Sequence, residues 1–312
     1  MGKRVLTITM NPSIDKTVSV KKLIPYGLNR VINSRIDIGG KGINVAKVLK
    51  SFGMDVTAAG LIAGKWGNFL LNSLKASGFS VEFTETCGEI RTNIKIVDTN
   101  VNRTTEINEP GFNVEAETIQ RFMNKFKTLA EKFDVIVLSG SLPPGVPQNF
   151  YSECIAAAKG LGKKTILDAD GVPLKEGLKA VPFAVKPNLH ELESLNGHIF
   201  SKKIEIVNAA KKLLKTGIEI VIVSMGADGA IVASKNEVFK ADSWKVEVKS
   251  STGAGDSMVA ALAYSIIEGY SLNDIAKITV SAGANTVSKA GTQVCTMDEI
   301  MKSLNYVNVY KI

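Results

Sequence analysis

The sequence predicts an α/β fold with a mostly parallel sheet, because strand-like and helix-like segments alternate along most of the chain. The strand-like segments are short, rich in β-formers and bounded by Gly, Pro or Asn, as buried strands are. In the segments between them, apolar residues recur at helical spacing. Buried strands joined by helices are typical of a parallel sheet built from βαβ units.

Six segments have the composition of buried strands, beginning with RVLTITM near the N-terminus. We expect strands at 4–10, 56–62, 134–140, 163–169, 182–188 and 219–225. Between them we expect helices at 43–53, 66–77, 115–132, 148–160 and 204–217. From about residue 253 onward the pattern is mostly helical, and it predicts helices near 255–268, 272–287 and 297–304.

Two segments, 16–38 and 92–109, break this alternation. Each has the pattern of two strands around a turn, with polar and apolar residues alternating, so that one face is wet and the other buried. We expect these strands to form a small antiparallel sheet separate from the main one. Because such a sheet is not stable alone in water, it should cover a cleft, pair with another subunit, or do both.

The composition and charge are ordinary for a soluble globular protein. Of the 312 residues, 45% are hydrophobic and 22% are charged, as in most such proteins. The net charge of +8 would suit anionic small molecules or nucleic acid, although dispersed surface lysines explain it more simply. Aromatic residues make up only 6% and no lysine tract reaches five, so the sequence disfavours a nucleic-acid partner.

The sequence predicts neither a membrane segment nor a disulfide framework. No run of about 18 or more apolar residues occurs, so no transmembrane helix is expected. Cys87, Cys154 and Cys295 lie far apart and form no C-x-x-C pair, which argues against a zinc site and against disulfides. We therefore expect a cytoplasmic protein that does not bind a membrane.

Polar and glycine-rich clusters follow several of the expected strands, namely NPSID, SGSLPPG, KPNLHE and SMGADG. Ligands of open parallel sheets bind at the carboxyl ends of the strands. These clusters, together with GGKG at 39–42 and TGAGD at 252–256, should therefore converge on one edge. The patterns G-x-x-x-x-G-K-[ST] and G-x-G-x-x-G do not occur, so neither a P-loop enzyme nor a typical dinucleotide-binding fold is supported.

The stretch TGAGD places glycines and one acid where a turn becomes a buried helix. The start of a helix has free N–H groups and a partial positive charge, and both attract anions. The amides of 253–256 would form an anion hole, with the carboxylate of Asp256 beside a transferring phosphoryl group. The helix dipole should keep Asp256 ionised and weakly basic, which phosphoryl transfer tolerates. The alternative is a simple helix cap.

The stretch GGKG repeats this design before a second amphipathic helix. Lys41 and Asn44 are its polar contributions. A tight turn before a helix is the alternative explanation, and Asp15 in NPSID could equally be a turn residue.

Two long stretches, GGKGINVAKVLKSFG and STGAGDSMVAALAYS, resemble the two signatures of the ribokinase-like (pfkB-type) carbohydrate kinases. KPNLHE and SMGADG fall between them in the family's order, so the resemblance covers essentially the whole chain. Within the family, TMNPSID, RTNIKI and LSGSLPPG are similar to the kinases of phosphosugars. The resemblance implies one kinase domain over 1–312, with a three-layer αβα core. It also implies a lid at about 16–38 and 92–109 that often makes the dimer contact.

The resemblance implies roles for individual residues. The proton acceptor would be Asp256, beside an anion hole formed by Gly253, Ala254 and Gly255. Sugar hydroxyls would be held by Asp15, Gly39, Gly40 and Asn44, and the phosphate already on the sugar by Lys41 and Arg91. Ser139 would either touch the substrate or cap the end of its strand. The nucleotide site would comprise Asn188, Ser224, Gly226, Gly229, Thr252, Gly255 and Asn285, with Glu191 organising Mg²⁺ through water.

The implied reaction transfers a phosphoryl group from ATP, with Mg²⁺, to fructose 1-phosphate and gives fructose 1,6-bisphosphate. Tagatose 6-phosphate and fructose 6-phosphate are alternative substrates that carry their phosphate at the opposite end of the sugar. A second alternative is a catalytically silent sugar or nucleotide sensor on the same fold, which the intact Asp256 and TGAG disfavour. The resemblance also implies a homodimer that contacts its partner through the lid.

Overall fold

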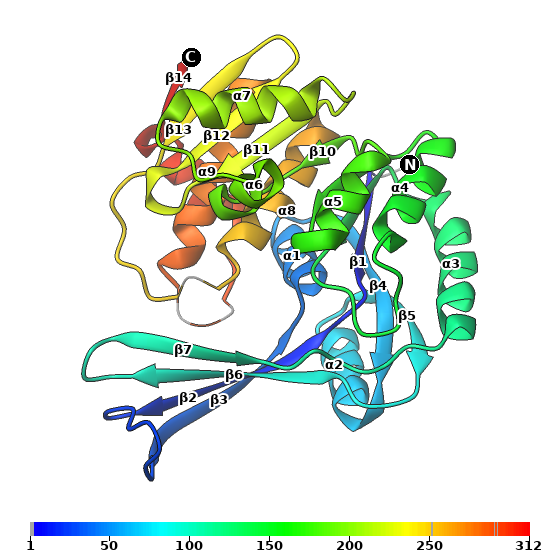
Figure 1. Cartoon of the computed structure of the whole chain (residues 1–312), viewed down its shortest axis with the longest axis vertical. Helices are drawn as coiled ribbons and strands as arrows, with labels where there is room; N and C mark the ends of the chain where they lie inside the picture. Colours follow the sequence, from blue (N-terminus) through cyan, green and yellow to red (C-terminus); the bar gives the residue numbers. More distant parts are fainter. Residues whose placement is uncertain (1–2, 251, 290, 292) are drawn as a thin grey trace.

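The main sheet in a computed structural model of the chain has ten strands (Figure 1), counted over the described residues 3–250, 252–289, 291 and 293–312. In spatial order they are β14 (Asn308–Lys311), β13 (Val238–Asp242), β12 (Ala230–Ser234), β11 (Ile220–Ser224), β10 (Ala184–Val185), β9 (Lys164–Asp168), β8 (Val135–Ser139), β1 (Arg4–Thr9), β4 (Asp55–Ala63) and β5 (Ser80–Thr86). The strands from β11 to β5 pair in parallel, and β12, β13 and β14 add an antiparallel edge.

The expected strands are all present in the parallel part of the sheet, as β1, β4, β8, β9, β10 and β11. Strand β10 has only two residues, because Pro182 and Pro187 flank it and cannot donate to a ladder. The sequence pattern does not predict β5, β12, β13 and β14. The chain after residue 253 is mostly helical, as expected, but its end forms β14 at the edge of the main sheet.

Helices cover both faces of the sheet, so the molecule has three layers (Figure 1). One face carries α2 (Gly64–Ala76), α3 (Ala116–Ala130), α4 (Phe150–Gly160), α5 (Gly171–Lys179), α6 (Leu189–Asn196) and α7 (Lys203–Leu214). The other carries α1 (Lys41–Ser51), α8 (Ala254–Glu268), α9 (Leu272–Val287) and α10 (Met297–Ser303). The expected three-layer αβα architecture is confirmed. Within the described ranges, no helix combines the length and apolarity that a bilayer span requires.

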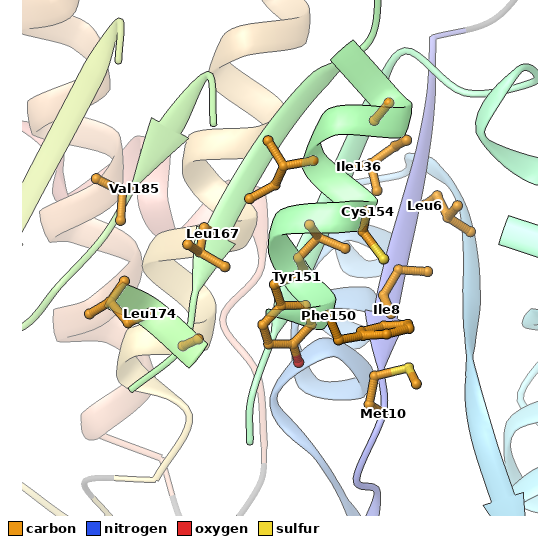
Figure 2. Close-up of a cluster of buried hydrophobic side chains, with 14 of the residues drawn as sticks. Leu6, Ile8, Met10, Ile136, Phe150, Tyr151, Cys154, Leu167, Leu174 and Val185 are labelled. Atoms are coloured by element: carbon orange, nitrogen blue, oxygen red, sulfur yellow. The ribbon is translucent and has the colours of Figure 1, made fainter. Parts of the chain in front are cut away.

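The central strands are buried on both faces and contribute to two cores. Along β1, Val5 packs with the layer of α1 and α8, whereas Leu6 and Ile8 pack on the side of α4. Figure 2 shows Ile8 beside Phe150 of α4, and Leu6 farther along β1 at the level of Cys154. Val5, Leu6, Ile8 and Phe150 are each at most 1% exposed. Burying such a side chain contributes roughly 1.5–3 kcal/mol to the stability of the fold. This packing fixes β1 and the polar cluster NPSID at its end.

The two segments expected to form a separate small sheet do so, as β2 (Ser13–Val20), β3 (Val31–Gly39), β6 (Arg91–Asp98) and β7 (Arg103–Asn108). We call these four strands the lid sheet, which projects from one end of the molecule (Figure 1). The hairpins β2–β3 and β6–β7 are antiparallel, as expected. Between them, β2 and β6 pair in parallel, because each continues outward from a strand of the parallel main sheet, β1 or β5.

The lid sheet has one polar and one apolar face. Its register places Asp15 beside Asn93 and Thr17 beside Lys95, so these four side chains share a face. The intervening positions share the opposite face, which carries Val18, Ile36, Ile94, Ile96 and Ile107. The polar face is the one that lines the cleft described next.

Candidate active site

A cleft of about 680 Å³ lies where the lid sheet meets the carboxyl ends of the parallel strands. The expected site residues that line it are Asp15, Gly40, Lys41, Asn44, Arg91, Asn188, Glu191, Ser224, Gly226, Thr252, Gly253, Gly255 and Asp256. These residues come from widely separated parts of the sequence, so most of the clusters at the strand ends converge as expected. The volume is that of a small-molecule site.

The N-termini of α1 and α8 meet in this cleft. Each helix follows a glycine with positive φ, Gly40 at 118° and Gly253 at 83°, a conformation that favours glycine. Asn44 in the first turn of α1 donates a hydrogen bond of 2.8 Å to Oδ2 of Asp256 in the first turn of α8. Because both helix starts have free N–H groups, the cleft has an anion-binding environment at this point.

The carboxyl group of Asp256 is more basic than the sequence argument suggests. Only 6% of the residue is exposed, and burial, helped by the negative charge of Asp168, raises its pKa from 3.8 to about 6. Lys41, Asn44 and Lys186 oppose this shift without cancelling it. The sequence argument expected Asp256 to be ionised and weakly basic; burial makes it more basic than that, while a pKa of about 6 still leaves most of the group ionised at pH 7. A pKa near neutrality suits a general base.

Asp168, at the end of β9, is a cleft residue that the sequence argument missed. Its Oδ1 lies 3.4 Å from Nζ of Lys186 and 3.6 Å from Nζ of Lys41. Burial opposes ionisation of Asp168, yet the two ammonium groups hold its pKa below the ordinary value. Asp168 is also the main cause of the raised pKa of Lys41. The available signal was an acid at the carboxyl end of an expected strand, in the letters LDAD.

Two lysines bring positive charge to the mouth of α8. Nζ of Lys186, a second residue that the sequence argument missed, lies 3.5 Å from where a Cβ on Gly255 would be. Lys41 is close enough to Asp256 for that carboxylate to contribute to its raised pKa. Lys41 therefore lies near the mouth of α8. Arg91 lies on the lid sheet, where Asp15 is the charged residue that most favours its protonated form against the effect of burial.

The lid sheet contributes a hydrogen-bonded polar row. Oδ1 of Asp15 accepts hydrogen bonds from Ser13 at 2.9 Å and from Asn93 at 3.0 Å. Gly39 lies beside this carboxylate, and a Cβ there would approach Oδ2 of Asp15 to 2.6 Å, so glycine leaves room for it. Burial lowers the pKa of Arg91, and its Nε has no hydrogen-bond partner within the described ranges. Arg91 therefore has donor capacity available for a ligand.

Ser139 does not line the cleft, and its burial favours the second of the two expected roles, a polar contact at the end of its strand. The residue is fully buried, and its Oγ donates to Oδ2 of Asp168 at 3.3 Å. The hydroxyl turns toward the neighbouring strand β9 because a buried donor needs an acceptor. Ser139 thus supports Asp168 from behind.

Asn188 and Glu191 form a capping box at the start of α6. The side chain of Asn188 accepts from the N–H of Glu191, and the carboxylate of Glu191 accepts from the N–H of Asn188, both at 2.8 Å. Burial raises the pKa of Glu191. In the part of the chain that the structure describes, no three His, Cys, Asp or Glu side chains are grouped to hold a metal ion. The capping box uses Oε2 of Glu191, and the residue also lines the cleft, so its second carboxylate oxygen fits a cation that keeps most of its water ligands, as Mg²⁺ does.

A second and more apolar cavity, of about 560 Å³, adjoins the cleft. Ser224, Gly226 and Gly255 line both spaces. The second cavity is also lined by Gly229, Trp244, Val248, Ala254, Met258 and Ala284. Its position beside the mouth of α8 and its apolar walls suit a flat heterocyclic group attached to phosphates.

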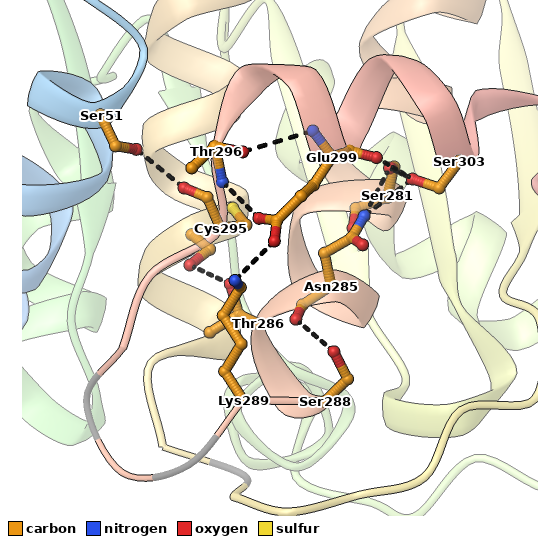
Figure 3. A network of polar contacts seen from close by, with 11 residues as sticks. Ser51, Ser281, Asn285, Thr286, Ser288, Lys289, Cys295, Thr296, Glu299 and Ser303 are labelled. Atoms are coloured by element: carbon orange, nitrogen blue, oxygen red, sulfur yellow. Dashed lines mark hydrogen bonds and ion pairs between the residues drawn. The ribbon is translucent and has the colours of Figure 1, made fainter.

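Asn285, expected at the nucleotide site, is not among the residues that line either cavity. Its Nδ2 donates to the carbonyl of Ser281 at 2.9 Å and to Oγ of Ser303 at 2.7 Å (Figure 3). The bond to Ser303 ties α9 to α10, on a side of α9 away from the cavity. The residues of α9 that do line the second cavity are Val280, Gly283, Ala284 and Val287.

A buried carboxylate, paired lysines and two anion-binding helix starts in a three-layer α/β fold are the features of a phosphotransferase. The profile of the pfkB family carbohydrate kinases matches residues 8–299, and the chain belongs to this family. The resemblance found in the two sequence signatures is thereby confirmed.

Named relatives and solved structures agree with the family. The chain is 35% identical over 309 residues to 1-phosphofructokinase of Borreliella burgdorferi, with 99% of each chain covered. It is 36% identical over 272 residues to 1-phosphofructokinase of Xanthomonas campestris, with 86% of each covered. The crystal structure of phosphofructokinase-2 from Escherichia coli in complex with potassium has a TM-score of 0.92 and 27% identity, covering 98% of this chain and 99% of that one.

Proposed function

We propose that this carbohydrate kinase transfers the γ-phosphoryl group of ATP to the 6-hydroxyl of fructose 1-phosphate, giving fructose 1,6-bisphosphate and ADP. Two relatives that match over most of their length bear the name of that activity. The observation that carries the proposal is a single cleft lined by both Asp256 and Arg91. A base and a cation suited to phosphate fit a substrate that has a reacting hydroxyl at one end and a phosphate at the other.

Asp256 accepts the proton of the attacking hydroxyl. With a pKa of about 6, most of its carboxylate is ionised at pH 7, and its basicity is higher than that of an ordinary aspartate. The hydrogen bond from Asn44 holds Oδ2 in place. The amides of Gly253, Ala254 and Gly255, at the start of α8, receive the transferring group.

The lysines near the anion hole offset negative charge during transfer. The transition state of phosphoryl transfer is loose and spreads charge over the equatorial oxygens. Lys41 and Lys186 are both held by Asp168, which fixes their ammonium groups before the substrates bind. We therefore assign Lys41 to the transferring phosphoryl group rather than to the phosphate already on the sugar.

The sugar phosphate lies against the lid sheet. Arg91 binds the phosphate, because its planar guanidinium pairs with two phosphate oxygens at once. Asp15 and Asn93, already hydrogen-bonded to each other at 3.0 Å, bind sugar hydroxyls. Gly39 and Gly40 leave space for the sugar beside Asp15.

The nucleotide occupies the second cavity, with its base against the apolar wall and its phosphates directed to the mouth of α8. Ser224, Gly226 and Gly229 lie along this path. Asn188 and Glu191 hold Mg²⁺ through water, in keeping with the few carboxylates that this ion requires. When bound, Mg²⁺ neutralises phosphate charge.

The protein forms a homodimer through the apolar face of the lid sheet, defined above by Val18, Ile36, Ile94, Ile96 and Ile107. Ile36 is 44% and Ile107 52% exposed, and an exposed apolar sheet face is a site for protein association. We further propose that residues 1–312 act as one kinase domain in the cytoplasm, in keeping with the three free cysteines.

A coupled ADP-release assay tests the substrate. Fructose 1-phosphate, fructose 6-phosphate and tagatose 6-phosphate are compared by kcat/KM with ATP and Mg²⁺, and we expect the highest value with fructose 1-phosphate. A higher value with fructose 6-phosphate would replace the proposal by 6-phosphofructokinase activity, the candidate favoured by the likeness to phosphofructokinase-2. If no ketose phosphate releases ADP, the protein is a sensor rather than a kinase.

A further inference from the structure

Lys95 is a lysine of the lid sheet that the proposed function does not use. It lies on the polar face of β6, beyond Arg91 and Asn93 on the same side of the strand. Its side chain is 16% exposed. It lines the cleft and also a smaller chamber of about 240 Å³ between the lid sheet and the segment that leads into α8. Because a charge partly withdrawn from water must be compensated, its partners indicate its role.

The close partner of Lys95 belongs to the mouth of α8. Its Nζ donates a hydrogen bond of 2.5 Å to Oγ1 of Thr252. Thr252 directly precedes Gly253, the N-cap of the helix. The carboxylate of Glu106 on β7 is 3.9 Å from the same Nζ, which is beyond hydrogen-bonding distance. The bond to Thr252 therefore connects the lid sheet directly to the segment that forms the anion hole.

Within the segment that leads into α8, the N–H of Thr252 donates to Oγ of Ser250 at 3.2 Å, and the bond from Lys95 adds a restraint that comes from the lid sheet. The N-cap of α8 is Gly253, at φ 83°, and among the described residues no side-chain hydrogen bond caps the helix. Glycines lose more conformational freedom than other residues when they are held in one conformation. An anion hole is effective only when its donors are in place before the reaction, and small displacements are costly. A bond to the residue before the N-cap holds the backbone at that point.

We propose that Lys95 is a positioning residue that makes the geometry of the anion hole depend on the lid sheet. When the lid sheet lies over the sugar, Lys95 holds Thr252, and the amides that follow are aligned for transfer. When the lid sheet is displaced, the restraint is lost and ATP is less well placed to react with water. The inference rests on the proposed function, since it assumes that these amides receive the phosphoryl group.

A double-mutant cycle tests the bond. Lys95→Met, Thr252→Val and the combined variant are assayed with ATP and the ketose phosphate that the wild type phosphorylates best. We expect each single substitution to lower kcat about 10- to 100-fold, the range for a hydrogen bond to a charged group. The KM for the sugar phosphate should change less than about threefold, because the loss is confined to the transition state. In the Thr252→Val background, Lys95→Met should cost less than about threefold.

Two further variants separate positioning from a general structural effect. Lys95→Arg keeps a charged donor and should recover part of the lost kcat. Lys127→Met removes an exposed lysine of α3 that lies outside the lid sheet and does not line the cleft, and should leave the kinetics unchanged. Melting temperatures show whether each variant is folded, and Lys95→Gln replaces Lys95→Met in the cycle if the latter does not fold.

Three results would overturn the inference. They are an unchanged kcat in Lys95→Met, losses that multiply in the double variant, and a large rise in KM for the sugar phosphate with kcat preserved. The last result would make Lys95 a phosphate ligand like Arg91. These outcomes differ from failure of the proposed function, in which the wild type itself phosphorylates no ketose phosphate.

Discussion

The side-chain amide of Asn44 in α1 donates a 2.8 Å hydrogen bond to Oδ2 of Asp256 in α8. This bond joins the two sequence signatures and fixes the carboxylate at the mouth of α8. Oδ1 of the same amide is buried without a hydrogen-bond partner in the described part of the chain. A buried acceptor without a donor is costly. Oδ1 of Asn44 is therefore suited to accept a hydrogen bond from a hydroxyl of the substrate, while its Nδ2 orients Asp256.

Replacing Asn44 by Ala should move the acidic limb of the pH profile upward. The bond from Asn44 lowers the pKa of Asp256, so its loss raises that pKa further. A shift of about one pH unit corresponds to roughly 1.4 kcal/mol, a usual value for such a bond. The measurement is kcat/KM between pH 5 and 9. An unmoved limb with a raised KM would mean that Asn44 binds sugar without orienting Asp256.

Replacing Asp168 by Asn should move the same limb downward. The negative charge of Asp168 raises the pKa of Asp256, and it also pairs with Lys41 and Lys186, which lower it. Removing the charge therefore makes Asp256 more acidic. We also expect kcat at the optimum to fall by about 10- to 100-fold and the stability by about 3–5 kcal/mol, because two lysines lose their buried partner. A limb that moves upward would contradict this electrostatic account.

Asp256→Asn should abolish turnover and make the protein more stable at alkaline pH. The pKa of Asp256 is raised from 3.8 to about 6, so the folded state holds this proton more tightly than the unfolded chain. Below pH 3.8, Asp256 is protonated in both states and the free energy of unfolding is unaffected. Between pH 3.8 and about 6 its ionisation lowers the free energy of unfolding progressively, and above about pH 6 the whole loss is present. That amount is on the order of 3 kcal/mol.

Urea unfolding at pH 4.5 and pH 8 measures this effect. The difference in unfolding free energy between Asp256→Asn and the wild type should be more favourable to the variant at pH 8. Comparing two pH values cancels the effect of the new amide itself. If variant and wild type differ in unfolding free energy by the same amount at pH 4.5 and at pH 8, the pKa of Asp256 is not raised in the folded protein.

The parts of the fold and site that follow from local patterns were predictable from the sequence. The parallel strands are short apolar runs. The glycines of GGKG and TGAGD precede helix starts, which are the kind of site that attracts anions. The edge strands β13 and β14 contain charged residues and lack such runs, whereas β12 has a buried apolar run, AIVA, that the expected set omitted. The parallel pairing of β2 with β6 depends on the paths of β1 and β5 rather than on alternation.

The parts that depend on distant neighbours were not predictable. Asp168 becomes a site residue only because Lys41 and Lys186 meet it from other elements. Ser139 turns to Asp168, and Asn285 turns to α10, because the nearest acceptors lie there. Similarly, the basicity of Asp256 comes from burial and from a second carboxylate, which one stretch of sequence does not reveal.

Lys240 is a buried lysine whose hydrogen bonds hold residues beside the second cavity in place. It is 1% exposed and donates to the carbonyls of Asp228 and Ala241 and, at 2.5 Å, to Oδ1 of Asp242. These acceptors adjoin Gly229, which lines the cavity. Lys240→Met should therefore raise the KM for ATP about tenfold or more and leave the KM for the sugar phosphate nearly unchanged.

Steady-state kinetics with each substrate varied in turn measure this difference. Lys311→Met is the matched control, because Lys311 lies on the adjacent strand β14 and makes an exposed ion pair with Glu237 at 3.0 Å. Exposed pairs contribute little, so this variant should behave like the wild type. Equal increases in both KM values for Lys240→Met would point to general loosening of the fold instead.

The apolar face of the lid sheet should control the oligomeric state. Ile107 of β7 is 52% exposed and pairs with Ile94 on the same face. In a two-fold symmetric dimer, Ile107→Asp introduces a charge twice, and burying each unpaired charge costs several kcal/mol. Sedimentation equilibrium should therefore show a dimer for the wild type and a monomer for this variant at micromolar concentration.

Ile204→Asp is the control, since Ile204 on α7 is similarly exposed, at 56%, but lies outside the lid sheet. A dimer that persists in Ile107→Asp and dissociates in Ile204→Asp would move the interface from the lid sheet to the helical face.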